Sequence, residues 1–331
     1  MALSVSDYQK AVNEYIKVNK KTVSADFGKA LKSTLDPYTK KITKVKGNFV
    51  NFHRLLSHVV QGYRSQWDSL GNASIEHKKL KNFHQKFNYP IVPADILASS
   101  LADLYEENKK IPNKEIAKIL IKDLFATVAD DVAFLSIKGV YDAANAFAQF
   151  GKSMNGIEKV VEIIAADTDH PAYKIPLNAL DDTNIVDEVT KFEKKLPKFF
   201  KTKIKEIHMS ENNVERYILR YEDEFGRNTT FKDGDKFKTR LGKRVLVGHP
   251  DMADDVIFAT PEGNLLKLID VIDNPPTITD VQVADYELKL FGEFWLGYDF
   301  AINEAVMVAN FADATEGLGD AAKMAKYYPH E

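Results

Sequence analysis

Gly151-Lys152-Ser153 is the short motif in this chain that comes nearest to a recognised chemistry, that of a phosphate-binding loop. Such a loop also needs a glycine five residues before Gly151 and a strand leading into it, because backbone N–H groups cradle the phosphates at that turn. Ala146 occupies the glycine position, and the residues before it have a helical pattern. The motif is therefore not expected to bind a nucleotide.

The eight histidines are scattered, and their spacing does not favour a metal site. The pairs His53/His58 and His77/His84 lack the i, i+4 separation that aims two ligands at one ion from a helix. Two groups combine acids with histidine: Asp167, Asp169 and His170, and His249, Asp251, Asp254 and Asp255. Both lie in proline-containing turns, where Asp accepts local backbone hydrogen bonds. We therefore expect surface histidines, no catalytic residue, no metal and no cofactor.

A lysine-rich segment between residues 191 and 205 is the remaining candidate for a binding surface. Phe192, Phe199 and Phe200 lie among its lysines, and nucleic-acid bases can stack on aromatics between basic residues. The lysines are Lys191, Lys194, Lys195, Lys198, Lys201, Lys203 and Lys205. The segment contains no arginine and also fits an amphipathic helix, so a solvated helix face is favoured over a site for single-stranded nucleic acid.

The composition is that of a globular protein, with 44% hydrophobic residues in a chain of 331. This length is enough for one large domain or two ordinary ones. No apolar run reaches the ~18 residues of a membrane helix, and residues 1–20 lack a signal-peptide core. The absence of cysteine excludes disulfides and thiolate catalysis. We expect a protein of the cytoplasm that does not associate with a membrane.

Charge is unevenly distributed, although the net value is only −3. Residues 1–90 hold 16 of the 45 Lys and Arg residues but only 6 of the 48 Asp and Glu residues, so this region is basic and the remainder is acidic. A basic region on an acidic body can contact nucleic acid or the acidic surface of another copy. Unrelated solvated faces are the plain alternative.

The longest helix is expected over Asn113–Lys138, where Asn113 can cap and apolar residues keep a helical period up to Gly139. The stripe that should form its core comprises Ile116, Leu120, Leu124, Val128 and Val132. Other helical patterns begin at Ser6 and cover residues 94–108, the stretch after Gly139 to Phe150, and residues 182–195 and 211–222. Ser210 and Gly226 are the expected cap and stop of the last of these.

Strand patterns occur at Lys203–Met209 and, four times, between Arg244 and Phe311. Helix and strand signals mix without a regular alternation, which indicates an α+β fold rather than a doubly wound sheet.

Between Ile42 and Pro93 the chain is expected to form two limbs on either side of a polar tip. If they are extended, the limbs reach roughly 70–80 Å, too far to fold back on a small body. The second limb fits helix and strand templates equally well. We expect this segment to lie across a neighbouring subunit, through Trp67, Lys78, Lys79, Leu80, Lys81, Phe83, Lys86 and Phe87.

The order of elements resembles the major capsid proteins of tailed bacteriophages, of the Hong Kong 97 type, over residues 42–311. The most specific part is Asp187–Met252. In it a helix ends at Lys195-Leu196-Pro197, a strand ends at His208-Met209-Ser210, a helix follows, and a last strand leads into Gly248-His249-Pro250-Asp251-Met252. The resemblance rests on this order and on no signature residue.

The resemblance implies a Hong Kong 97-like α+β fold with a defined division of the chain. It implies an N-terminal arm (1–41), an extended loop (42–93), a spine helix with the first part of a peripheral domain (94–155), an axial domain (156–279), returning peripheral strands (280–311) and a C-terminal tail (312–331). It also implies a non-enzymatic protein that self-assembles into an icosahedral shell around double-stranded DNA.

The implied partners are other copies of the chain in pentamers and hexamers, separate scaffolding and portal proteins, and packaged double-stranded DNA bound without sequence specificity. The implied location is the virion capsid, assembled in the host cytoplasm. Two alternatives stay open at this point. One is an encapsulin-like compartment, which has the same fold around protein cargo, and the other is a metal-dependent hydrolase built on His249 and its aspartates.

Overall fold

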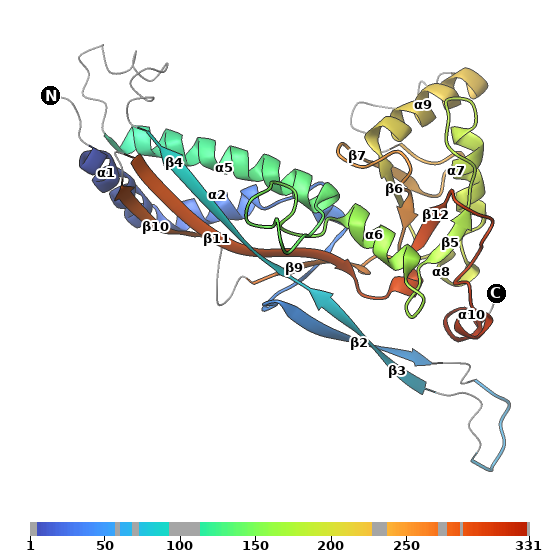
Figure 1. Cartoon of the computed structure of the whole chain (residues 1–331). Coiled ribbons are helices and arrows are strands. Elements are labelled where there is room, and N and C mark those ends of the chain that lie inside the picture. The colour runs from blue at the N-terminus through green and yellow to red at the C-terminus, as the bar shows by residue number, and fades with distance from the viewer. Residues whose placement is uncertain are drawn as a thin grey trace.

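The computed structural model describes residues 5–56, 60–67, 73–92, 113–226, 237–270, 277–284 and 287–329. In these ranges the chain forms two large hydrophobic cores, each with its own five-stranded sheet, a small third cluster of Val45, Leu80, Leu266 and Leu268, and a two-stranded hairpin that projects from the cores (Figure 1). Helices and strands are both abundant and do not alternate regularly, as expected for an α+β fold.

The first core lies between a sheet and three helices. The sheet has the order β1-β9-β11-β10, and β4 also pairs with β11. Its strands are β1 (Lys40–Ile42), β4 (Phe83–Ile91), β9 (Leu265–Ile269), β10 (Thr277–Ala284) and β11 (Glu287–Phe300). The helices are α1 (Val5–Val18), α2 (Lys20–Ala30) and α5 (Asn113–Lys138), and both α1 and α2 contact α5 and β10.

The long strand β11 organises this sheet. Buried and partly buried residues alternate along it, because successive side chains of a strand point to opposite faces. Leu288, Leu290 and Phe294 face the helices, where the ring of Phe27 packs against Phe294 and stacks on Phe125. The helices therefore cover one face of the sheet.

Helix α5 has the bounds that its sequence predicts, Asn113–Lys138. Leu120, Leu124, Val128 and Val132 are all buried in the first core, so the stripe faces inward. The side chain of Ile116 lies outside the described residues, as does the helix expected over residues 94–108.

The stretch after Gly139 is not the helix that its pattern predicts. Residues 143–151 form turns, and the next helix is α6 (Ile157–Ala166). A Cβ atom on Gly139 would lie 2.6 Å from two backbone oxygens, and one on Gly156 would lie 2.4 Å from the oxygen of Ile137. The two glycines thus let backbone segments cross closely at the end of α5, which turns the chain away from a helical path.

The second core surrounds a sheet of order β5-β12-β8-β6-β7. Its strands are β5 (Tyr173–Pro176), β6 (Glu206–Ser210), β7 (Val245–His249), β8 (Phe258–Ala259) and β12 (Met307–Asn310). The helices around it are α7 (Ile185–Lys194), α8 (Lys198–Lys201), α9 (Glu211–Phe225) and α10 (Ala321–Tyr327). The Ser210 hydroxyl accepts the N–H of Asn213 and caps α9, which ends at Gly226 with φ +79°, as predicted.

Four segments pack differently from the division expected for the chain. The N-terminal arm is two helices, and Val12 and Phe27 lie in the first core. Helix α6, expected in an axial domain, packs in the first core, and strand β9, expected there too, pairs with β11 in the first sheet. The C-terminal tail belongs to the second core, in which Tyr327 and Tyr328 are buried. For the arm and the tail, apolar area is removed from water on the chain's own body, which an extended segment would leave exposed.

Candidate assembly surfaces

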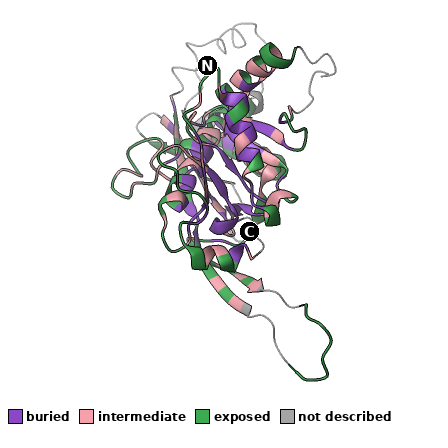
Figure 2. Cartoon of the chain, turned by 90° about the vertical axis from the view of Figure 1, so that its right-hand side faces the viewer, coloured by how far each residue is buried: buried purple, intermediate pink, exposed green. Residues whose placement is uncertain are grey.

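The hairpin of β2 (Asn48–Leu56) and β3 (Ala73–Lys81) projects from both cores (Figure 1). The strands are antiparallel, and Asn48 pairs with Lys81 at the root and Leu56 with Ala73 at the outer end. Residues 60–67 continue beyond that end and are exposed throughout (Figure 2). A two-stranded ribbon in water is marginally stable, so its root must be held and its length needs another surface.

The outer face of the hairpin is apolar and basic. Val50, Phe52 and Ile75 lie on this face, and the exposed fractions of Phe52 and Ile75 are 67% and 66%. Arg54 and Lys79 lie on the same face, because residues two apart and their cross-strand partners share a side of a ribbon. Apolar groups rimmed by charge are typical of a surface that binds another protein.

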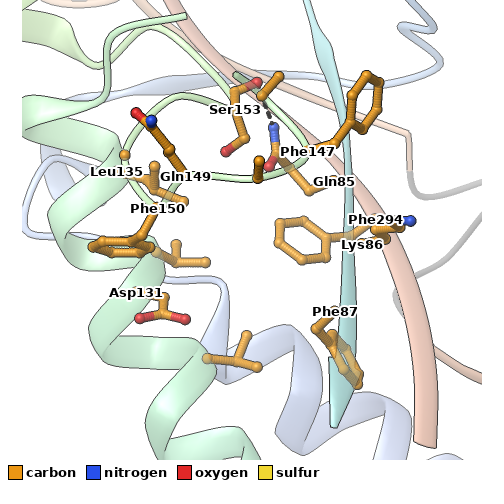
Figure 3. A pocket seen from close by; sticks show the side chains of 15 residues that line it. Gln85, Lys86, Phe87, Asp131, Leu135, Phe147, Gln149, Phe150, Ser153 and Phe294 are labelled. Atoms are coloured by element: carbon orange, nitrogen blue, oxygen red, sulfur yellow. Dashed lines mark hydrogen bonds between the residues drawn. The ribbon is translucent and has the colours of Figure 1, made fainter. Parts of the chain in front are cut away.

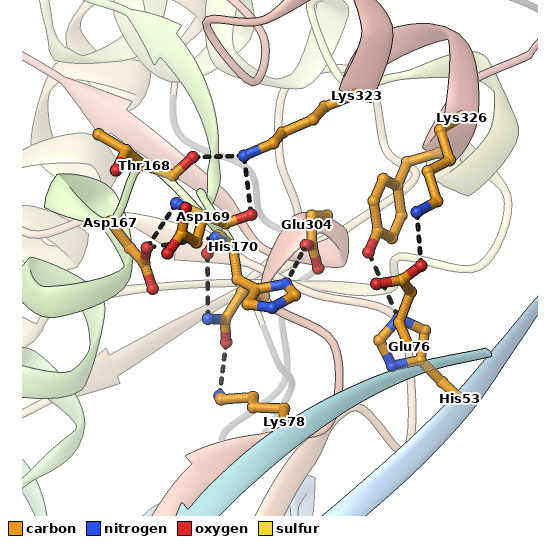
Figure 4. A network of polar contacts seen from close by, with 12 residues as sticks. His53, Glu76, Lys78, Asp167, Thr168, Asp169, His170, Glu304, Lys323 and Lys326 are labelled. Atoms are coloured by element: carbon orange, nitrogen blue, oxygen red, sulfur yellow. Dashed lines mark hydrogen bonds and ion pairs between the residues drawn. The ribbon is translucent and has the colours of Figure 1, made fainter. Parts of the chain in front are cut away.

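The inner face carries a polar network that ties the hairpin root to the body (Figure 4). The Nζ of Lys78 lies 2.5 Å from Asp299 Oδ1 and 2.5 Å from Asn303 Oδ1, and it donates to the carbonyl of Phe300. Asn303, which belongs to the short helix η2 (Asn303–Ala305), donates to the His170 carbonyl in turn. The root is therefore fixed to the turn after β11.

The C-terminal helix holds the hairpin farther out. Lys326 of α10 lies 2.5 Å from Glu76 on β3, and His53 on β2 lies 3.4 Å from the hydroxyl of Tyr327 (Figure 4). The hydrogen bond and charge of Lys326 lower the pKa of Glu76. Burial lowers the pKa of His53, although the negative charges of Glu304 and Glu76 act to raise it. Two separate elements thus set the direction of the hairpin.

Several residues that the sequence predicts to contact a neighbouring subunit pack within the chain itself, so the prediction is wrong for them. Leu80 and Phe83 are fully buried, and Phe87 packs on the first core with its ring over Gly292. The segment from Phe83 to Ile91 is strand β4, paired with β11 from Leu296 to Leu288. Its apolar residues are covered because β11 offers them a sheet edge and a core.

Of the four lysines predicted to contact a neighbouring subunit, two contact the chain's own residues and two are exposed. Lys78 is in the root network, and Lys81 lies over the rings of Tyr141 and Phe83, at 4.0 and 4.8 Å from their centroids. Lys79 and Lys86 are exposed, as is Trp67. For these three residues the predicted contact role stays a prediction.

The groups singled out for chemistry form local structure instead. Asp167 Oδ1 accepts the backbone N–H groups of Asp169 and His170, as expected for a turn. Gly151 lies in a turn at φ +84°, after α5 rather than after a strand. In the lysine-rich segment, Lys195 pairs with Glu316, and Lys203 lies over Phe199 and Phe200. Within the described ranges no three His, Cys, Asp or Glu side chains converge on one point.

His208 and His249 are not surface histidines, contrary to expectation. Both are buried where β6 and β7 run side by side, with His208 Nδ1 3.0 Å from His249 Nε2. His249 Nδ1 lies 3.0 Å from the hydroxyl of Thr34. Both nitrogens of His249 are thus engaged within the protein, which does not favour His249 as the metal ligand of the hydrolase alternative.

This pair predicts acid sensitivity. Burial lowers the pKa of His249 to about 4 and, with His249 beside it, lowers that of His208 well below the ordinary value. Above pH 6.5 both imidazoles are neutral in the folded and unfolded chains. Between pH 6.5 and about 4 the two imidazoles bind protons in the unfolded chain but stay neutral in the folded chain. The free energy of unfolding should therefore fall as the pH is lowered, by about 3 kcal/mol for His249 alone.

The measurement is urea unfolding from pH 8 to pH 4. The His249→Gln variant should lose stability at every pH but show a smaller decrease below pH 6.5, and His77→Gln, at an exposed position of the hairpin, is the matched control. An unchanged pH slope in His249→Gln would contradict the assignment.

No family model and no curated protein matches the sequence, but solved structures match the fold. The capsid of an empty gene transfer agent (GTA) particle matches with TM-score 0.51 and 13% identity, over 85% of this chain and 91% of that one. The procapsid of satellite phage P4, which includes a size-determination protein, matches with TM-score 0.52 and 8% identity, over 89% and 98%. Gordonia phage Cozz gives 0.52 and 12%, over 85% and 87%. The chain therefore has the α+β fold of proteins in tailed-phage and GTA particles.

Proposed function

We propose that this chain is the major capsid protein of a tailed phage, which self-assembles into an icosahedral shell around double-stranded DNA. The observation that carries the proposal is the hairpin, which is anchored to the body at two places and leaves an apolar, basic outer face in water. The fold shared with particle proteins supports it. The role is structural rather than enzymatic.

The proposal includes a Hong Kong 97-like arrangement, with α5 as spine helix and the second core as axial domain. Copies form pentamers and hexamers, a separate scaffolding protein directs closure, and a portal protein occupies one vertex. DNA is held without sequence specificity, and the finished protein is located in the virion capsid after assembly in the host cytoplasm. Among the described helices, none has both the length and the apolar character that a bilayer-spanning segment needs.

The hairpin is expected to hold neighbouring copies together mainly by apolar contact. Each exposed ion pair contributes only ~0.2–1 kcal/mol, so Phe52 and Ile75 should supply most of the affinity, while Arg54 and Lys79 set the register. Many repeats of one weak contact make a closed shell strong.

The test is electron microscopy and sedimentation of the expressed chain. The wild-type protein should form particles much larger than a monomer, of irregular closure when no scaffolding protein is supplied, and Phe52→Ser/Ile75→Ser should stay folded by circular dichroism while sedimenting as small species. Reversal of Lys79 and Lys86 to glutamate should slow assembly in a salt-dependent way. Leu219→Ser, at an exposed site on α9, is the control. Normal particles from the double serine variant would remove the hairpin from the contact, and a monomeric wild-type chain would overturn the function.

The encapsulin-like compartment is the alternative expected to have the same fold, and the similar structures found, which are phage and GTA particles, do not favour it. The nucleic-acid content of the particles distinguishes the two hypotheses. Particles from infected cells should contain double-stranded DNA if the chain is a phage capsid protein, and protein cargo if it forms an encapsulin-like compartment.

A further inference from the structure

The two N-terminal helices present one continuous basic face to water. Only Asn19 separates α1 from α2, and its N–H donates to the Tyr15 carbonyl, which continues the helical hydrogen bonds across the break. The side toward the first core is apolar and includes Val12 and Phe27. The opposite side and the chain that follows α2 form a surface that we call the N-terminal basic face. Its exposed lysines are Lys10, Lys17, Lys20, Lys21, Lys29, Lys32, Lys40, Lys41 and Lys44.

Several lysines of this face form a row. Lys10, Lys17, Lys21 and Lys32 are 7, 4 and 11 residues apart, close to whole helical turns, so they lie on one side of the helix pair. Along the helix axis the row is roughly 33 Å long, at ~1.5 Å per residue. Lys32 and Lys41 line one small cavity together, so the basic face continues from the end of α2 onto β1.

Few acidic residues offset this charge. Between residues 9 and 46 the sequence has ten lysines and three acidic residues. Asp36 pairs with Lys267 inside the protein, Asp26 pairs with Lys29, and the third acid, Glu14, lies in the row itself. Helix α5, on which α1 and α2 pack, has a balanced surface instead. The exposed charged side chains described there are Lys118, Lys122, Lys138, Asp123, Asp130 and Asp131.

The chemistry of the face does not favour a protein or a membrane as its partner. A protein interface has an apolar centre, but on the described part of α1 and α2 Val18 is the one large apolar side chain that is exposed. Exposed aromatic rings occur elsewhere, at the pocket between α5 and β4 that Phe147 and Phe150 border (Figure 3). A membrane surface would take up the apolar side of an amphipathic helix, which the first core already covers here.

A row of lysines without apolar neighbours suits the phosphates of a nucleic-acid duplex. One turn of duplex DNA is ~34–36 Å long, about the length of the row, so several lysines can meet phosphates along it. Residues 9–46 contain no arginine, the side chain best suited to bidentate recognition, and Lys binds phosphate as a point charge. Binding should therefore depend on backbone charge and not on base sequence.

We infer that the N-terminal basic face is the surface on which packaged double-stranded DNA lies, held through its phosphates. The inference rests on the proposed function and identifies the part of the chain that lines the interior of the particle. It places the exposed side of α1 and α2 toward the DNA.

Lysine acetylation read by mass spectrometry locates the contact on the full chain. The chain is kept at concentrations too low for assembly, checked by sedimentation, and is acetylated with and without a short duplex of random sequence. Lys17, Lys20 and Lys21 should lose reactivity when the duplex is present. Exposed lysines beside the second core should react equally in both samples, and these are Lys194, Lys238 and Lys243.

The salt dependence of duplex binding tests the same lysines by substitution. Each phosphate contact on duplex DNA contributes about −0.9 to the slope of log K against log salt concentration. Lys17→Gln/Lys20→Gln/Lys21→Gln should therefore make the slope shallower by about 2–3 and weaken binding at low salt by about tenfold or more. The control loses the same net charge beside the second core and should keep the wild-type slope; it is Lys194→Gln/Lys238→Gln/Lys243→Gln. Circular dichroism checks that both variants are folded.

The outcomes separate this inference from the proposed function. Weaker duplex binding by the Lys17/Lys20/Lys21 variant, with particles like those of the wild type, supports the inference. Protection of other lysines, or an unchanged slope, overturns it and leaves the capsid function in place. A variant that binds the duplex normally but forms no particles would show that the face contacts an acidic surface of another copy, which also overturns it. A wild-type chain that stays monomeric overturns the proposed function and with it the packaging role of the face.

Discussion

Leu124→Asp is expected to leave the chain unfolded. Leu124 is buried at the middle of α5, in the core that α1, α2 and the first sheet share. Loss of the leucine side chain removes ~2–5 kcal/mol, and burial of an unpaired carboxylate costs several kcal/mol more. This sum approaches the whole stability of an ordinary domain, about 5–15 kcal/mol. Circular dichroism and the soluble yield should both collapse.

Lys122→Asp is the control for this variant, since the same carboxylate is then placed on the exposed side of the same helix. It should remain folded. A soluble Leu124→Asp protein with native circular dichroism would show that the stripe on α5 is not core.

Glu193→Gln is expected to destabilise the second core strongly. Glu193 on α7 and Arg244 before β7 form an ion pair with both side chains almost fully buried, at 2.5 Å. Arg244 also donates to the carbonyl of Lys201. Neutralising one partner leaves the guanidinium charge uncompensated in a dry site, which typically costs about 3–5 kcal/mol. Chemical unfolding should show a large decrease in the midpoint.

The double variant Glu193→Met/Arg244→Met tests the reason for this loss. If the cost comes from an unpaired buried charge, replacing both partners by apolar side chains should recover most of the stability. Glu262→Gln is the control, because its pair with Lys205 is exposed and its removal should change little. A double variant as unstable as the single one would assign the loss to packing instead.

Substitutions in the two cores and in the hairpin are expected to affect assembly for different reasons. The cores hold Asp299, Asn303 and α10 in place, and these groups fix the hairpin through Lys78 near its root and Glu76 farther out. A substitution in a core should therefore prevent assembly by preventing folding. A substitution on the outer face of the hairpin should prevent assembly alone, and the two effects are separated by circular dichroism.

Elements governed by local interactions could be predicted from the sequence. The bounds of α5, the Ser210 cap and the Gly226 stop depend on residues within a few positions of one another. The turn at Asp167 depends on its own neighbours in the same way. The order of such elements along the chain was also sufficient to indicate a capsid-like fold.

Only the tertiary structure decided what covers each apolar residue. Phe87 lies opposite Gly292, some 200 residues away, and no local pattern specifies that pairing. The limb that fitted helix and strand equally well therefore became β3 of the hairpin and β4 of the chain's own sheet, and Phe83 and Phe87, expected at a neighbour, pack in or against the first core. His208 and His249 were buried for the same reason, since β6 and β7 are adjacent only after folding. Whether a side chain is buried depends on residues that are distant from it in the sequence. The exposed outer face of the hairpin could therefore be identified only after the structure showed which residues are buried.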